Sequence, residues 1–466
     1  MYMSHTECNP RIIPDLSASS TTHMEAGAKR EAMSSSLGTE ADQEHNGSAY
    51  TIAATAHAVD TDSWQQVGLL LVTSFNCAYV LSFSNLMLVP LGWGWGIACL
   101  LIVAAAAWYA NWLLAGLHVI DGQRFIRYRD LMGFCLRKMY YITWSLQFSI
   151  QLLGNMGFIL LGARALKAIN VELSHSPARL QWFIPGTGTV FFAFSYLVPT
   201  ISAMRKWLAM TVAYDVTLLA ILVKDGKSNR QKDYGVHGSP AEKAFNALGA
   251  VAAILVCNTS GMLTEIQQST LRSPAVRNMR RALAVQYTAG AAAYYGVSAA
   301  GYWAYGSAVL EYLPDQLGGP RWAVVLINAA AFLQSVVSQH MFTAPVHEAL
   351  DTRLQRLHEG TSSRYNLTRR LCARGLVLAF NVLVAALLPF MGDFVNLFGS
   401  FALVPLTLVF PSMIVLKING KSRGRWSRIW HWGIIAVSTV LGVATTAAAV
   451  RLIFHNARVY HFFADM

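Results

Sequence analysis

Two short polar stretches interrupt long apolar segments of this chain, and their residues are the best placed to bind a solute. The first is Ser74-Phe75-Asn76-Cys77, which continues into Ala78-Tyr79, and the second is Asn258-Thr259-Ser260-Gly261. Small polar residues also let membrane helices pack closely, so packing is the alternative for the first stretch. The second stretch sets poor helix formers beside a glycine. Two such breaks in corresponding places favour a pair of broken helices around a ligand.

The chemistry expected at a broken helix is the binding of a zwitterion. One half-helix ends in free carbonyl groups and the next begins with free N–H groups, which gives a negative and a positive pole. We expect a solute carboxylate at the half-helix that begins near Cys77 or Ala78. We expect the ammonium group near the carbonyls of Ser74 and Val256.

Three titratable residues lie in or at the end of apolar segments, where such groups usually face a cavity. Asp215 is either a carboxylate paired with a neighbouring helix or an acceptor for a proton or cation. Glu265 is a gate or proton site, or a helix-end carboxylate paired with Arg272. His340 is a proton relay or a hydrogen-bonded packing histidine.

Asn155 is a further binding candidate, on the third apolar segment. It shares one helical face with Gln147 and Gln151, and it is the member of this face nearest to mid-membrane. Hydrogen bonding between helices is the alternative role for these three side chains.

The elements that position these residues are membrane spans. The chain has 466 residues, of which 54% are hydrophobic and 13% charged, whereas about 25% are charged in soluble domains. We predict an all-α polytopic membrane protein with about eleven spans of roughly 20 residues. The predicted spans are residues 65–89, 92–117, 139–163, 181–201, 207–223, 244–264, 282–305, 322–342, 376–390, 394–416 and 429–450.

The distribution of Lys and Arg predicts which ends of the spans face the cytoplasm. With the N-terminus inside, the basic loops are residues 124–138, 205–206, 272–281, 353–374 and 417–428, as the positive-inside rule requires. The exception is the loop from Lys224 to Lys243, which this topology places outside. The net charge of +12 is explained by this bias, so we expect no nucleic-acid partner. The C-terminus is then extracellular.

Residues 1–62 differ in composition from the rest of the chain. They are rich in Ser and Thr with few aromatics, which predicts a disordered cytoplasmic tail. A transporter domain would span residues 63–453, followed by a short C-terminal tail, residues 454–466. No nucleotide-binding loop, metal-ligand cluster or nucleophile triad is visible in the sequence. We therefore predict neither an enzyme nor a cofactor or metal site.

Several strings of residues run in order from about Asp62 to the C-terminus. They include Val89-Pro90-Leu91-Gly92-Trp93, Ile126-Arg127-Tyr128-Arg129-Asp130-Leu131, Tyr302-Trp303-Ala304-Tyr305-Gly306-Ser307 and Leu388-Pro389-Phe390-Met391-Gly392-Asp393-Phe394. These strings resemble the plant proline transporters, which carry compatible solutes and belong to the amino acid and auxin permease group. This group is part of the amino acid, polyamine and organocation superfamily.

The resemblance implies a fold and a function. It implies an inverted 5+5 repeat like that of the bacterial leucine transporter, with helices 1 and 6 discontinuous and one extra C-terminal helix. It also implies proton-coupled uptake of proline, glycine betaine and 4-aminobutyrate at the plasma membrane. The chain departs from these relatives at Ser82 and Asn85, where they have glycines, and at Thr264, where they have proline. The alternatives are another amino acid or auxin carrier, or a solute sensor that does not transport.

Overall fold

The first predicted span is divided into three short helices in the computed structural model of the chain. They are α2 (Trp64–Phe75), α3 (Ala78–Ser82) and α4 (Asn85–Leu88). Ser63 begins α2 with a capping box, in which its hydroxyl accepts the N–H of Gln66 at 3.4 Å. The structure describes residues 51–52, 62–120, 123–198, 209–228, 232–258, 271–272, 274–310, 312–317, 319–355, 363–387, 397, 399–419 and 424–457.

Longer helices follow the other predicted spans. They are α5 (Gly92–Leu117), α7 (Met139–Leu173), α8 (Leu180–Leu197), α9 (Ala209–Ser228), α10 (Pro240–Asn258), α12 (Ala275–Val285), α13 (Ala291–Tyr305), α15 (Arg321–Leu354), α16 (Arg364–Leu387), α18 (Phe410–Asn419) and α19 (Arg425–Ala457). In the described part of the chain, 7 helices are long and apolar enough to cross a membrane. The prediction of a polytopic helical membrane protein is therefore confirmed.

Three π-helical segments continue or precede these helices. They are η2 (Gln286–Gly290), η4 (Gly399–Leu403) and η5 (Pro405–Val409). The short helices α6 (Tyr128–Leu136) and α14 (Leu313–Gln316) and the 3-10 turn η3 (Gly306–Ala308) lie in connections. π-helical turns are rare and frequently lie at functional sites. Because η2 interrupts the helix that runs from α12 into α13, it is of interest for the site.

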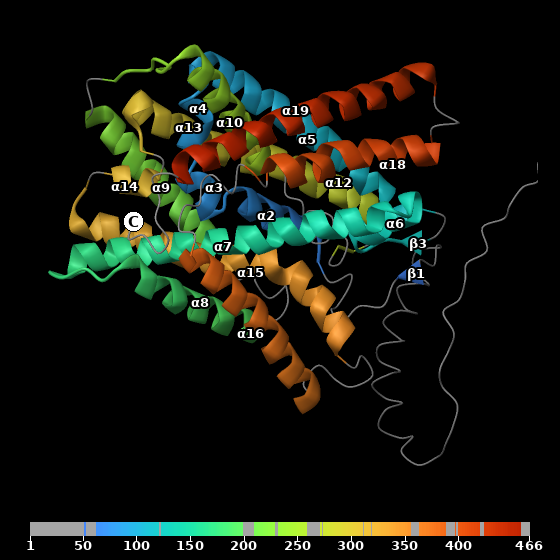
Figure 1. The fold of residues 1–466 in the computed structure, drawn as a ribbon, viewed down its shortest axis with the longest axis horizontal. Helices are drawn as coiled ribbons and strands as arrows, with labels where there is room; N and C mark the ends of the chain where they lie inside the picture. Colours follow the sequence, from blue (N-terminus) through green and yellow to red (C-terminus); the bar gives the residue numbers. More distant parts are fainter. Residues whose placement is uncertain are drawn as a thin grey trace, which may run out of the picture. The chain divides into compact units, whose positions relative to one another are not determined.

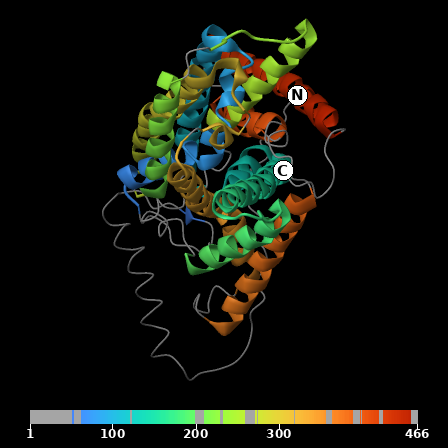
Figure 2. The ribbon, with the colours of Figure 1, turned by 90° about the vertical axis from the view of Figure 1, so that its left-hand side faces the viewer.

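The helices α7 and α15 pack along much of their length, and they form the scaffold on which the other helices rest (Figure 1). The helices α8 and α16 contact them, while α9 and the short helix α3 contact α15 from elsewhere. Figure 2 shows α7 and α15 nearly end-on, with α8 and α16 beside them. The buried core includes Ile159 and Leu161 of α7 and Ile327 and Ala331 of α15. This core places the broken span of α2 and α3 against a rigid pair of helices.

A small sheet follows α5. Strand β3 (Gln123–Arg124) pairs antiparallel with β2 (Val119–Ile120) and parallel with β1 (Thr51–Ile52), so the strand order is β1-β3-β2. Strand β1 falls in the stretch predicted as a tail, whereas residues 1–50 lie outside the described part. The otherwise helical fold therefore carries three very short strands.

One loop of the predicted outer side is fixed by unusual contacts. Lys232 donates to the carbonyl of Gly226 in the last turn of α9 at 2.6 Å and lies 4.1 Å from the Trp303 ring. A cation is favoured at this end of a helix dipole. Gly306 has φ 65°, and a Cβ there would lie 2.2 Å from the Asp233 carbonyl oxygen, so only glycine fits. Lys232, one of the basic residues that depart from the charge bias, thus has a structural role.

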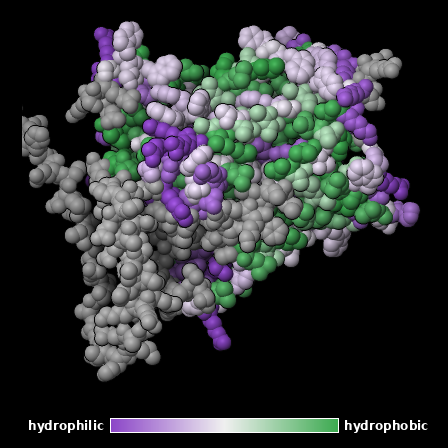
Figure 3. Space-filling model, turned by 180° about the vertical axis from the view of Figure 1, so that it is seen from behind, coloured by the Kyte–Doolittle hydropathy of each residue, from purple (hydrophilic) through white to green (hydrophobic). Residues whose placement is uncertain are grey.

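The surface carries many large apolar side chains. Trp95, Tyr141 and Trp426 are each at least three-quarters exposed. Figure 3 shows hydrophobic side chains over the broad centre of one face, with hydrophilic ones mainly toward its left and right margins. Apolar patches of this extent indicate contact with another apolar phase, here the lipid bilayer.

Candidate functional site

The predicted break in the first span is confirmed. Helix α2 ends at Phe75, Asn76 caps it, and α3 begins at Ala78. The backbone N–H of Asn76 donates to the Val72 carbonyl at 3.1 Å, and its Nδ2 donates to the same carbonyl at 3.0 Å. An asparagine side chain that competes for backbone partners in this way favours the end of a helix. Ser74 and Tyr79 lie in α2 and α3, but their side chains are outside the described part of the structure.

The backbone groups freed by the break are bound by one side chain, that of Gln334 on α15. Its Nε2 donates to the Asn76 carbonyl at 2.7 Å. Its Oε1 accepts the N–H of Ala78. Since the Gln334 side chain is 0% exposed, these bonds form in a dry environment where an unpaired backbone group costs several kcal/mol. Gln334 therefore stabilises the unwound geometry between α2 and α3.

Gln334 also reaches a third helix. Its Nε2 lies 3.4 Å from the Thr211 hydroxyl of α9. One turn further along α9, Asp215 is half-buried, and its buried Oδ1 has no hydrogen-bond partner in the described part of the chain. Residues four apart share a helical face. Asp215 therefore lies on the side of α9 that carries the Gln334 contact, about 6 Å along the helix axis.

The amide of Asn76 points to the π-helical segment η2. Its Nδ2 donates to the carbonyl of Gly290 at 3.2 Å, while its Oδ1 is buried without a partner. A buried acceptor without a partner in the described residues is unusual, because most such atoms are hydrogen-bonded. This oxygen is available to a donor such as the ammonium group of a solute.

The second predicted break lies mostly outside the described residues. Asn258 is the last described residue of α10, and its Nδ2 donates to the Ile254 carbonyl at 2.9 Å. Its backbone carbonyl accepts from the Tyr287 hydroxyl at 3.0 Å, and its Oδ1 accepts from Tyr295 at 3.1 Å. The other candidates of this region, Thr259, Ser260, Gly261 and Glu265, lie outside the described residues.

Segment η2 connects the two breaks. Gly290 binds Asn76 of the first break, and Tyr287 binds Asn258 of the second. Tyr287 in turn accepts from the amide of Asn111 on α5 at 2.8 Å. A π-helical turn leaves backbone carbonyls displaced from the regular α-helical pattern. We interpret this as the reason that the Gly290 carbonyl can accept from a side chain of another helix.

The remaining candidates are not brought to the breaks by any described contact. Asn155 is buried on α7, and its Oδ1 has no partner among the described residues. His340 contacts the Phe194 ring of α8 at 5.8 Å and the His347 ring at 6.1 Å. Six residues separate His340 from Gln334, which places them about 120° apart around α15. His340 therefore faces α8 rather than the first break.

Two ion pairs bind the far end of α15 to neighbouring helices. Arg127 makes a bidentate pair with Glu348, at 2.6 Å and 3.1 Å. Arg374 of α16 pairs with Asp351 at 2.6 Å and donates to the Ser195 carbonyl of α8 at 2.8 Å. The second pair is almost completely buried. Such contacts set the position of one end of α15.

Gln334, Tyr287 and Gly290 are site residues that we did not predict from the sequence. Gln334 carried a usable signal, since a glutamine within an apolar span needs hydrogen-bond partners. Tyr287 and Gly290 gave no such signal in the sequence, because tyrosine and glycine are common in membrane helices. Only the observed π-helical turn shows that their groups meet the two breaks.

Comparison with known proteins now identifies the family. Residues 60–451 match the family described as "Transmembrane amino acid transporter protein". The chain belongs to this family. It is a transporter rather than an enzyme.

Individual relatives agree with this assignment. "GABA transporter 1" of Arabidopsis thaliana is 27% identical over 425 residues, which are 87% of this chain and 93% of that protein. "Lysine histidine transporter-like 1" of the same plant is 26% identical over 390 residues, 80% of this chain and 84% of that protein. These names confirm an amino acid transporter family, but they are not those of proline transporters.

Solved structures support the predicted fold. A manganese transporter of Eremococcus coleocola aligns with a TM-score of 0.55 at 15% identity, covering 86% of this chain and 91% of that chain. A sodium-coupled sialic acid symporter aligns with a TM-score of 0.51 at 12% identity, covering 87% and 92%. At these identities the likeness concerns the fold alone. It confirms the leucine-transporter-like fold that the sequence predicts.

Proposed function

We propose that the chain is a proton-coupled symporter that imports proline and related compatible solutes, including glycine betaine and 4-aminobutyrate. The observation that carries the proposal is the break between α2 and α3, which is held open in a buried environment by Gln334. Discontinuous helices near the bilayer midplane hold the solute in transporters of this architecture. The name of the relative "GABA transporter 1" supports 4-aminobutyrate as one solute to test first.

The proposed binding mode follows the two poles of the broken helix. The N–H groups of proline or 4-aminobutyrate would donate to Asn76 Oδ1, which has no partner among the described residues. The trimethylammonium group of glycine betaine has no N–H, so it would contact this oxygen only through its charge. The carboxylate would face the first turn of α3, where Gln334 already accepts the N–H of Ala78. The remaining N–H groups of that turn are therefore the ones proposed for the carboxylate.

We expect Asn76→Ala to raise the solute concentration for half-maximal uptake by about 5- to 100-fold. The substitution removes a possible acceptor for the ammonium group and the bond to Gly290, at a cost of about 1–3 kcal/mol. Concentration-dependent uptake of labelled 4-aminobutyrate and proline measures it. Asn328→Ala is a matched control, because Asn328 is also a buried span asparagine, and among the described residues its side chain binds only Val324 of its own helix. If the two substitutions had equal effects, the solute would not bind at Asn76 and the binding site would lie elsewhere.

Proton coupling is the second part of the proposal, and Asp215 is its first candidate carrier. A carboxylate can bind and release a proton, whereas the amide of Asp215→Asn cannot. We expect uptake by the unchanged chain to rise as the outside pH falls, and uptake by Asp215→Asn to lose this dependence. Uptake of proline, glycine betaine, 4-aminobutyrate and auxin at controlled pH and membrane potential measures it. Uptake that depends on neither pH nor membrane potential would exclude proton coupling.

The alternatives give different results in the same screen. Another amino acid or auxin carrier of the family would compete with unlabelled solutes of its own class. A solute sensor would bind its ligand in reconstituted vesicles without uptake. If Asp215→Asn keeps the normal pH dependence, His340 and Glu265 become the next candidates.

A further inference from the structure

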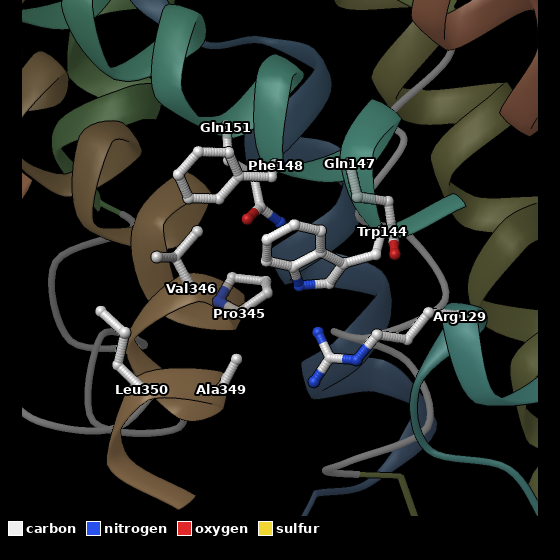
Figure 4. Close-up of a pocket in the computed structure, with 9 residues that line it drawn as sticks. All are labelled: Arg129, Trp144, Gln147, Phe148, Gln151, Pro345, Val346, Ala349 and Leu350. Atoms are coloured by element: carbon white, nitrogen blue, oxygen red, sulfur yellow. The ribbon is translucent and has the colours of Figure 1, made fainter. Parts of the chain in front are cut away.

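A pocket lies between α7 and α15, at the end of these helices that is next to α6 (Figure 4). Its apolar walls include Trp144 and Phe148 of α7 and Val346 and Leu350 of α15. The cavity has a volume of about 60 Å³, counted as the space open to the centre of a water-sized sphere. At roughly 10–15 Å³ for each water, that is room for about five heavy atoms, the size of a phosphate group.

Three polar side chains, those of Arg129, Gln147 and Gln151, line this otherwise apolar pocket. Gln151 is 4% exposed, and Figure 4 shows its amide turned into the pocket between the rings of Phe148 and Trp144. Within the described part of the chain, this amide makes no hydrogen bond. The guanidinium group of Arg129 enters from α6 at the open end. An amide that makes no hydrogen bond to the described residues, in a pocket that a guanidinium group also lines, favours a polar ligand of negative charge.

The nearby acidic side chains, Glu348 and Asp130, contact Arg127 and not Arg129 in the described structure. Glu348 forms the bidentate pair with Arg127, and Asp130 lies 3.7 Å from the same guanidinium. Burial raises the pKa of the Asp130 carboxyl, and the charges of Arg127 and Arg129 oppose this rise. No described acidic residue makes a salt bridge with Arg129. Its positive charge is therefore available to a bound anion.

The surroundings favour a lipid as the source of this anion. Trp144 is 45% exposed, and the neighbouring Tyr141 and Ile142 of α7 are 75% and 48% exposed. Basic pockets between spans bind anionic lipid head groups, and exposed aromatic side chains cover the adjoining acyl region.

We propose that this pocket binds the phosphate of an anionic phospholipid, held by Arg129 and Gln151. Its acyl chains lie along Trp144 and the exposed face of α7. The proposal requires only that the chain spans a membrane, and it does not depend on which solute is transported. Because Arg129 follows Arg127 by two residues, and Arg127 pairs with Glu348 of α15, a bound lipid would also stiffen this end of the scaffold.

The test uses the purified full-length chain in a neutral detergent. Phosphatidylglycerol is added, and lipid binding is followed by native mass spectrometry and by the shift in unfolding temperature. We expect the unchanged chain to bind phosphatidylglycerol at least tenfold more tightly than phosphatidylcholine. Arg129→Gln should remove most of this preference, and Ala349→Phe should abolish binding by filling the pocket while keeping the arginine. Lys138→Gln is the matched control, which loses a charge at the same end but does not line the pocket.

Three results would overturn the proposal. One is equal binding of both lipids by the unchanged chain. Another is the same loss of binding in Lys138→Gln as in Arg129→Gln, which would reduce the effect to general surface charge. The last is an equal thermal shift with inorganic phosphate alone, which would indicate a site for a soluble anion. None of these readouts involves solute uptake, so failure here is distinct from failure of the proposed transport function.

Discussion

Gln334→Leu is expected to reduce solute uptake at least tenfold while the protein still reaches the cell surface. Leucine has a similar volume but cannot bind the Asn76 carbonyl or the Ala78 N–H, which Gln334 now binds together. Each buried group left unpaired costs about 1–3 kcal/mol, and about 1.4 kcal/mol corresponds to a factor of ten. The broken helix would then lose the geometry proposed for solute binding. Initial uptake rates, normalised to surface protein, measure the effect.

The same helix offers a matched control. Gln339→Leu is also a buried glutamine-to-leucine change on α15, but the Oε1 of Gln339 has no partner among the described residues. Replacing an unsatisfied polar group by an apolar one costs little. We expect uptake by Gln339→Leu to stay within a few fold of the unchanged chain. Normal uptake by Gln334→Leu would show that the break does not need this amide.

A second substitution separates hydrogen bonding from packing at this position. In Gln334→Glu, only the protonated acid can both accept from Ala78 and donate to Asn76. We expect uptake by this variant, taken as a ratio to the unchanged chain at each pH, to rise as the pH falls. A ratio that is constant with pH would assign Gln334 a role in packing alone.

Arg374→Met is expected to destabilise the protein by about 3–5 kcal/mol, the usual cost of leaving one partner of a buried ion pair uncompensated. Arg374 is almost fully buried, where it pairs with Asp351 and also binds the Ser195 carbonyl. One guanidinium group therefore connects α15 of the scaffold to α8 and α16, the two helices packed beside it. The unfolding temperature in detergent and the amount of protein at the surface measure the loss.

The double variant Arg374→Met with Asp351→Asn tests the cause of that loss. Removing both charges should recover part of the stability, because no uncompensated carboxylate remains. Arg353→Met, an exposed arginine on α15, should change the stability by less than about 1 kcal/mol. If the double variant is no more stable than Arg374→Met, the bond to Ser195 and packing dominate instead.

Some predicted features were accessible from local sequence. The end of α2 at Phe75 follows from a polar residue that binds its own helix, as Asn76 does. The spans follow from apolar length. Their ends were less well predicted, since α15 continues to Leu354, beyond the apolar window that ended at Phe342. Tertiary contacts such as Arg127–Glu348 and Arg374–Asp351 stabilise that polar extension.

The sequence by itself determined the class of protein and the place where the first span breaks. These properties depend on composition and on neighbours along one helix, which a single chain displays directly. Only the tertiary structure decided which residues serve the breaks. Gln334, Gly290 and Tyr287 lie far along the chain from Asn76 and Asn258, and their hydrogen bonds depend on how α15 and η2 pack. The same packing directs His340 toward α8. Which neighbour a side chain meets depends on how the helices pack, and the sequence of one helix does not show this.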